Sequence, residues 1–146
     1  MDMIPPGPSR LHRFSPQEAL ICAMVMMSAV DGSMTDAELR RMTRLVGDLP
    51  SFAGTGPADV ERVTDVCLKL LDDAEGLERG IGLIAAALPP RLRETAYVLA
   101  CEVASANGDT NQDELRFLQD LRIGLDLDRL VAGAIERAAR ARFQVV

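Results

Sequence analysis

Residues 19–30, ALICAMVMMSAV, constrain the fold more than any other stretch of this chain. They follow Ser15-Pro16-Gln17-Glu18, where a serine cap, a proline at the first helical position and a glutamate three residues after the cap predict the start of a helix. This helix would be apolar on nearly every side, yet its apolar run is too short to span a bilayer. We therefore expect a buried central helix that other helices surround.

Prolines, glycines and capping residues divide the rest of the chain into further helices. The cap-and-glutamate pattern recurs from Thr35 to Glu38 and from Asn111 to Glu114, and Pro57 can occupy the first position of another helix. The sequence predicts a loop over 48–56 and helices over about 15–30, 35–47, 57–71, 75–88, 91–106, 111–124 and 127–141.

Length and composition favour a single all-α domain. The chain has 146 residues, of which 48% are hydrophobic but only 3% aromatic, with no tryptophan. A core of Leu, Ala, Val, Ile and Met suits helices better than sheets, whose pleated surfaces prefer aromatic and β-branched side chains. We expect an all-α, single-domain bundle of about seven helices over residues 15–142, preceded by a flexible, proline-rich N-terminal arm, residues 1–14.

A unit of about 30 residues occurs twice. With Gly32 placed over Gly108, an offset of 76, several positions carry identical or chemically similar residues. The pairs are Glu18 and Glu94, Asp31 and Asn107, Ser33 and Asp109, Thr35 and Asn111, Glu38 and Glu114, Leu39 and Leu115, and Arg40 and Arg116. The unit is a buried apolar helix, an acidic turn and a capped amphipathic helix. We interpret it as an internal repeat and expect its two apolar helices to pack against each other.

The paired acidic turns allow two interpretations. A glycine after a helix, and a cap with glutamate three residues later, are ordinary helix punctuation, so both turns could be purely structural. Alternatively, their polar side chains converge on a divalent cation. Oxygen donors without His or Cys suit calcium, magnesium or manganese. The candidate metal ligands are Asp31, Glu38, Asn107, Asp109 and Glu114.

An EF-hand calcium loop is excluded by its fixed spacing, which requires glycine at position six and glutamate at position twelve. Counted from Asn107, these positions are Gln112 and Leu118. The turn that begins at Asp31 lacks both residues as well. Any site here has only three or four candidate ligands per turn, so we expect a low affinity unless a partner or a phosphate adds oxygens.

The duplicated turns resemble those of the TerB-like family of tellurite-resistance proteins. The resemblance spans roughly residues 15–142 and rests on the length, on the duplication and on the turns themselves, Asp31-Gly32 to Glu38 and Asn107-Gly108-Asp109 to Glu114. Members of this family are cytoplasmic all-α domains built from two helix–turn–helix halves. One departure is that Asn107 stands where the family pattern has Asp, so the second turn would bind a cation differently, with Asp109 replacing the missing charge, or would not bind one at all.

The resemblance implies a bacterial stress-response role, in resistance to tellurite and other toxic agents, with acidic residues that hold a metal ion. It also implies protein partners of the same system, some of them membrane-associated and some calcium-binding, and relatives among the N-terminal domains of membrane-anchored co-chaperones. Two functions stay open: a metal-responsive stress module, and a protein-interaction scaffold whose turns bind no metal.

The sequence lacks the usual signatures of catalysis. The only histidine, His12, lies in the expected arm, and there is no Glu-x-x-His pair, Walker loop or Rossmann fingerprint. We therefore expect a non-enzymatic protein. The net charge of −6 repels phosphate backbones, so a nucleic-acid partner is not expected.

The expected location is the cytoplasm, without direct membrane insertion. The stretch MDMIPPGPSR has no apolar segment of the kind found in secretory signals, and no apolar run is long enough for a transmembrane helix.

Five polar or reactive residues lie inside predicted apolar helices. Cys22, Cys67 and Cys101 are far apart in the sequence and are expected to be buried, reduced thiols. Tyr97 is expected in the core with its hydroxyl hydrogen-bonded. Glu102 is expected to pair with an arginine, because burying a lone carboxylate is unfavourable.

Overall fold

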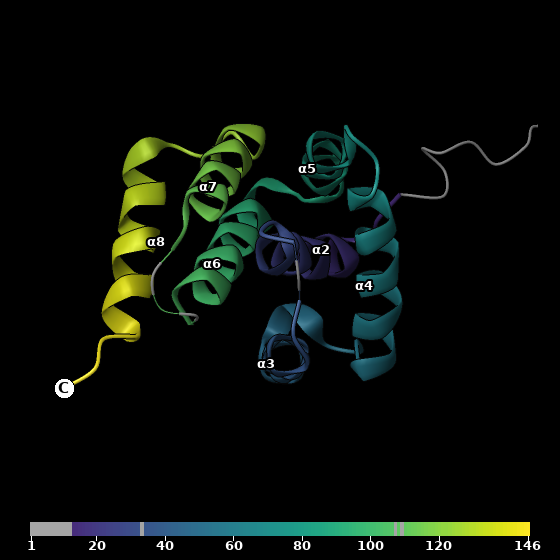
Figure 1. The fold of residues 1–146 in the computed structure, drawn as a ribbon, viewed down its shortest axis with the longest axis horizontal. Helices are drawn as coiled ribbons and strands as arrows, with labels where there is room; N and C mark the ends of the chain where they lie inside the picture. Colours follow the sequence, from purple (N-terminus) through teal and green to yellow (C-terminus); the bar gives the residue numbers. More distant parts are fainter. Residues whose placement is uncertain (1–12, 33, 107, 109) are drawn as a thin grey trace, which may run out of the picture.

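Helix α2 (Pro16–Ala29) lies at the centre of the molecule, as its apolar sequence predicts (Figure 1). Ten consecutive residues, Ala19 to Ser28, are buried. The helix begins with the expected capping box, in which Ser15 Oγ accepts a hydrogen bond from Glu18 N and Glu18 Oε1 accepts one from Ser15 N. Because a helix that is apolar on all sides must be covered on all sides, α2 determines where its neighbours lie.

The structure is a computed structural model, and it describes residues 13–32, 34–106, 108 and 110–146. Within these ranges the chain forms helices and no strand. The elements after α2 are α3 (Asp36–Asp48), the short 3₁₀-helix η1 (Pro50–Phe52), α4 (Pro57–Leu71), α5 (Gly76–Ala87), α6 (Pro90–Ala106), α7 (Gln112–Gly124) and α8 (Arg129–Arg142). The predicted all-α bundle is confirmed.

Helix α2 packs against α3, α4, α5 and α6, and less extensively against α7 (Figure 1). The most extensive packing is between α2 and α6, which confirms that the two apolar helices meet. Helices α7 and α8 pack on α6 and form one end of the molecule, whereas α4 forms the other end (Figure 1). The internal repeat from which the α2–α6 contact was expected stays a prediction.

Two features differ from the sequence prediction by more than a shift of one residue. The expected loop, 48–56, contains η1, and its Phe52 is buried in the core. The last helix begins at Arg129, two residues later than predicted, with Asp128 as its N-cap. Asp126 has a φ of 56°, a left-handed conformation that does not suit an N-cap, so the helix does not begin directly after it.

The core is built from aliphatic and methionine side chains, with few aromatic rings. Met24, Met26, Met27 and Met42 are fully buried. Phe14, the last residue of the predicted arm, also lies in this cluster. Residues 1–12, including His12, lie outside the described residues, so the arm and the domain limits 15–142 stay predictions.

The polar residues expected in apolar helices are placed as predicted. All three cysteines are buried and free, and burial raises the pKa of the Cys22 thiol well above its usual range. Tyr97 is buried and its hydroxyl donates a hydrogen bond of 2.5 Å to Glu136 Oε2. Glu102 Oε1 lies 2.7 Å from Arg142 Nε, which confirms the expected arginine pair.

Within the described part of the chain, no helix has both the length and the apolar character that are needed to cross a bilayer.

Candidate functional site

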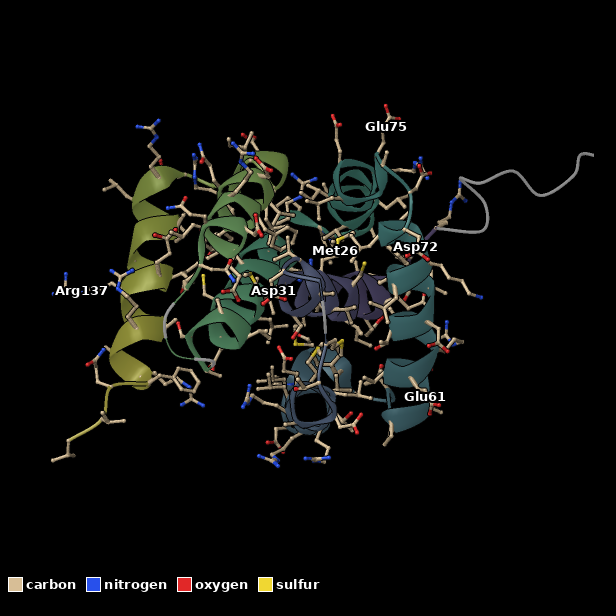
Figure 2. All side chains as sticks on the ribbon, viewed as in Figure 1. Met26, Asp31, Glu61, Asp72, Glu75 and Arg137 are labelled. Atoms are coloured by element: carbon tan, nitrogen blue, oxygen red, sulfur yellow. The ribbon has the colours of Figure 1, made fainter. Side chains whose placement is uncertain are left out.

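The first acidic turn connects α2 to α3. Gly32 has a φ of 107°, a backbone conformation that glycine adopts without steric cost, and its N–H donates a hydrogen bond to Ala29 O. Asp31 is exposed at this turn (Figure 2), and Ser33 lies outside the described residues. The carboxylate of Asp31 therefore faces solvent at the point where the chain reverses.

Glu38 connects the two helices on either side of the first turn. Its Oε1 accepts a hydrogen bond from Thr35 N at 2.9 Å, and Thr35 Oγ1 accepts one from Glu38 N at 3.1 Å, which completes a capping box. Its Oε2 accepts a 2.8 Å hydrogen bond from the hydroxyl of Ser28, a buried residue near the end of α2. Glu38 thus has a structural role, because one carboxylate joins the end of α2 to the start of α3.

The second acidic turn, between α6 and α7, repeats the local geometry of the first. Gly108 has a φ of 89°, and Asn111 and Glu114 form a capping box with hydrogen bonds of 2.9 and 3.0 Å. Asn107 and Asp109, two of the predicted metal ligands, lie outside the described residues. The capped start of α7 is therefore confirmed, whereas the geometry of these two side chains is not described.

Glu114 differs from Glu38 in its surroundings. It is only 5% exposed, although it is a carboxylate. Its Oε1 accepts the hydrogen bond from Asn111 N, and no second hydrogen bond reaches it from the described residues. At the offset of 76, the counterpart of Ser28 is Ala104, which has no hydroxyl to donate. A buried carboxylate oxygen without a donor is unfavourable, so this position favours a cation or another donor.

The predicted ligands do not form a metal cluster among the residues that the structure describes. No group of three or more His, Cys, Asp or Glu residues in those ranges is arranged to hold an ion. Of the five predicted ligands, Asp31 is exposed, Glu38 accepts hydrogen bonds from Ser28 and Thr35, and Glu114 is buried. A complete cation site would need Asn107 or Asp109, or oxygens from outside the chain.

Sequence reasoning missed two groups of functional interest. Ser28 is the lone hydroxyl in an apolar helix, and that isolation was a usable signal for a buried hydrogen bond. Glu136, by contrast, lies 39 residues from Tyr97, and nothing in the local sequence around either residue indicates that they meet.

We expect that Ser28→Ala destabilises the first turn by about 1–3 kcal/mol, since it removes a hydroxyl that donates a hydrogen bond to the half-buried Glu38 carboxylate. Urea unfolding would measure this change. Ser105→Ala on α6 is a matched control, because the same hydroxyl is removed from a side chain without a hydrogen bond in the described part of the chain. Equal urea midpoints for the two variants would contradict the structural role of the Ser28–Glu38 bond.

A comparison with protein families gives one match, to the family described as tellurite resistance protein TerB, over residues 17–136. No curated protein and no solved structure matches the chain. The matched region extends from the first turn of α2 into α8 and includes both acidic turns. It covers most of the chain, and the all-helical architecture agrees with it. The chain therefore belongs to the TerB family of tellurite-resistance proteins.

Proposed function

We propose that this protein is a non-enzymatic stress-response module of the tellurite-resistance type, and that it binds a divalent cation, calcium, magnesium or manganese, through its acidic turns. The observation that carries the cation proposal is the buried carboxylate of Glu114, which has one oxygen without a donor among the described residues. Asn107 and Asp109 precede it in the same turn of the sequence and carry further oxygen donors. Hard divalent cations prefer such carboxylate and amide oxygens.

The two turns then have different roles. In the first turn Glu38 is already hydrogen-bonded to both flanking helices. Asp31 and Glu38 would therefore attract a cation by their negative charge rather than coordinate it directly. In the second turn a cation would neutralise Glu114 and supply the missing partner. Because only a few ligands come from the protein, the affinity would be low, and a partner that adds oxygens would raise it.

A second candidate function is a protein-interaction scaffold whose turns bind no metal. The hydrogen bonds of Glu38 favour it, since helix capping alone explains the three-residue spacing between Thr35 and Glu38. In either case we propose a cytoplasmic protein that acts through protein partners, some of them at the membrane.

The cation proposal is tested by NMR titration of the isotope-labelled protein with calcium, magnesium and manganese ions. We expect millimolar ion to shift the amide resonances around Glu114. Glu114→Gln keeps the shape of the side chain and removes its charge, and should weaken binding by about ten-fold, because one ionised ligand is lost.

Glu61→Gln is the matched control, because it makes the same charge change at an exposed position on α4 (Figure 2). It should leave the affinity within a factor of about two, as expected for a distant, screened charge. If no ion shifts the amide resonances of either turn, or if Glu114→Gln and Glu61→Gln bind the ion with the same affinity, the cation proposal is wrong and the scaffold function is favoured.

A further inference from the structure

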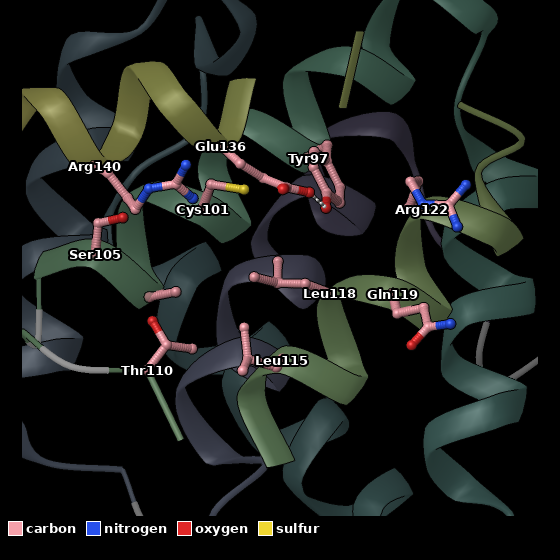
Figure 3. Close-up of a pocket in the computed structure, with 11 residues that line it drawn as sticks. Tyr97, Cys101, Ser105, Thr110, Leu115, Leu118, Gln119, Arg122, Glu136 and Arg140 are labelled. Atoms are coloured by element: carbon pink, nitrogen blue, oxygen red, sulfur yellow. Dashed lines mark hydrogen bonds between the residues drawn. The ribbon is translucent and has the colours of Figure 1, made fainter. Parts of the chain in front are cut away.

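A cavity lined by both charged and apolar side chains lies between α6, α7 and α8 (Figure 3). Helices α7 and α8 both pack on α6 but do not pack closely on each other. The space between them is a pocket of about 370 Å³. This volume falls in the lower range of small-molecule sites, about 300–1,000 Å³. None of the described candidate cation ligands, Asp31, Glu38 or Glu114, lines it.

One wall of the pocket holds a fixed carboxylate. Glu136, on α8, accepts the 2.5 Å hydrogen bond from the hydroxyl of Tyr97, on α6 (Figure 3). Burial, and then the bond to Glu136, raise the pKa of Tyr97 above its usual range, so the phenol stays protonated and acts as a donor. Burial and the Glu136 charge also raise the pKa of the Cys101 thiol to about 12. Among the described residues that line the pocket, Glu136 is the one acidic side chain.

Two guanidinium groups flank this wall, Arg122 beyond Tyr97 and Arg140 beyond Cys101 (Figure 3). The charge of Arg122 partly offsets the rise in the pKa of Tyr97, and the charge of Arg140 partly offsets the rise in the pKa of Cys101. Within the described residues neither arginine has a carboxylate within 4.0 Å, whereas Arg79 and Arg142 each have one and Arg62 has two. The described lining residues thus carry two positive charges and one negative charge, in a protein whose net charge is −6.

The rest of the lining is divided between hydrogen-bonding and apolar groups. Ser105 and Thr110 supply hydroxyls and Gln119 an amide, while Leu115 and Leu118 form an apolar surface. A ligand that fits has an apolar body against the leucines and a negatively charged group against the arginines. Arginine binds planar or tetrahedral oxyanions through two parallel N–H donors.

We propose that this pocket binds a small organic oxyanion, a carboxylate or a phosphate monoester on a short apolar body. Arg122 is the anchor for the oxyanion, because it is half-buried and its charge is less screened by solvent than that of the exposed Arg140. Arg140 adds to the positive field. Glu136 opposes the anion and limits the affinity, while its bond to Tyr97 holds α8 at a fixed position on α6.

The test uses four probes and NMR titration of the labelled protein. Phenyl phosphate and phenylacetate carry the two oxyanions on the same ring, phenethylamine carries a positive charge on that ring, and inorganic phosphate has no apolar body. We expect the two aromatic oxyanions to shift resonances of the pocket residues and to bind more weakly as sodium chloride is added. Whichever of these two compounds binds more tightly shows whether the pocket prefers a phosphate or a carboxylate group.

Four variants decide which side chains are responsible. Arg122→Gln should weaken binding by about ten-fold or more, as expected for the loss of a charge-assisted hydrogen-bond pair, and Arg140→Gln by about two- to three-fold. Glu136→Gln should strengthen it several-fold, because the amide can still accept from Tyr97 while the opposing charge is gone. Arg137→Gln, an exposed position at the outer edge of α8, is the charge-matched control and should change nothing (Figure 2).

The proposal is overturned if neither aromatic oxyanion shifts the resonances of the pocket residues. It is also overturned if phenethylamine or inorganic phosphate binds as tightly as the aromatic oxyanions. It is also overturned if Arg122→Gln behaves like Arg137→Gln. Should Arg122→Gln unfold, the gain in affinity of Glu136→Gln and the salt dependence of the wild-type protein still decide the matter.

Discussion

Gly76→Ala is expected to destabilise the protein by about 3 kcal/mol or more, since it forces a methyl group into backbone that has no room to move. Gly76 is the first residue of α5 and is buried. A Cβ at this position would lie 1.7 Å from Leu70 O, 2.7 Å from Leu70 C and 3.2 Å from Leu71 Cα. All three atoms belong to the backbone at the end of α4, so the α4–α5 connection would have to open.

The same helix provides the control. Gly82 is exposed, and a Cβ there would meet nothing within 4 Å. Gly82→Ala should therefore stabilise the protein by about 0.5–1 kcal/mol, because alanine loses less backbone entropy in a helix than glycine does. Thermal unfolding followed by circular dichroism should show Gly76→Ala melting about 10 °C lower than the wild type and Gly82→Ala slightly higher. Two variants that melt together would refute the close approach of α4 and α5 at Gly76.

Met26→Ala is expected to destabilise the protein by about 2–5 kcal/mol, the range for truncating a large buried side chain to alanine. Met26 is fully buried on α2 and extends toward α5 (Figure 2). A Cβ built on Gly80 would lie 1.9 Å from Met26 Cε and 3.0 Å from its Sδ. The methionine thus fills the space that the missing side chain of Gly80 leaves, and its removal creates a cavity at the α2–α5 contact.

This contact predicts a coupling between the two positions. Gly80→Ala alone should cost about 1–3 kcal/mol, because the end of Met26 has to move aside. In the double variant the alanine methyl occupies part of the cavity, so the combined loss should be smaller than the sum by about 1 kcal/mol. Urea unfolding of the full cycle measures the coupling.

Met26→Ala combined with Gly82→Ala is the control for this cycle. Gly82 has no neighbour within 4 Å of a built Cβ, so its effect should add to that of Met26→Ala. If the Met26–Gly80 pair is equally additive, the two residues do not share the space that the structure assigns to them.

The candidate cation site was only partly accessible to sequence reasoning. The capping boxes at Thr35 and Asn111 could be predicted, because they depend on a side chain and an N–H three residues apart. The different surroundings of Glu38 and Glu114 could not. They depend on whether the facing helix presents a hydroxyl, as Ser28 does, and that requires knowing how the helices pack.

The sequence by itself determined the helices and the class of fold. Helix starts follow from interactions within about four residues, and the burial of α2 follows from its apolar sequence, both of which act before any tertiary contact forms. The contact of α2 with α6 was expected from the internal repeat of an apolar helix. Only the tertiary structure decided the pocket of Tyr97, Arg122, Glu136 and Arg140, and the contact of Met26 with Gly80. These groups come from different helices, so their distances are set by helix packing, for which short-range sequence patterns carry no signal.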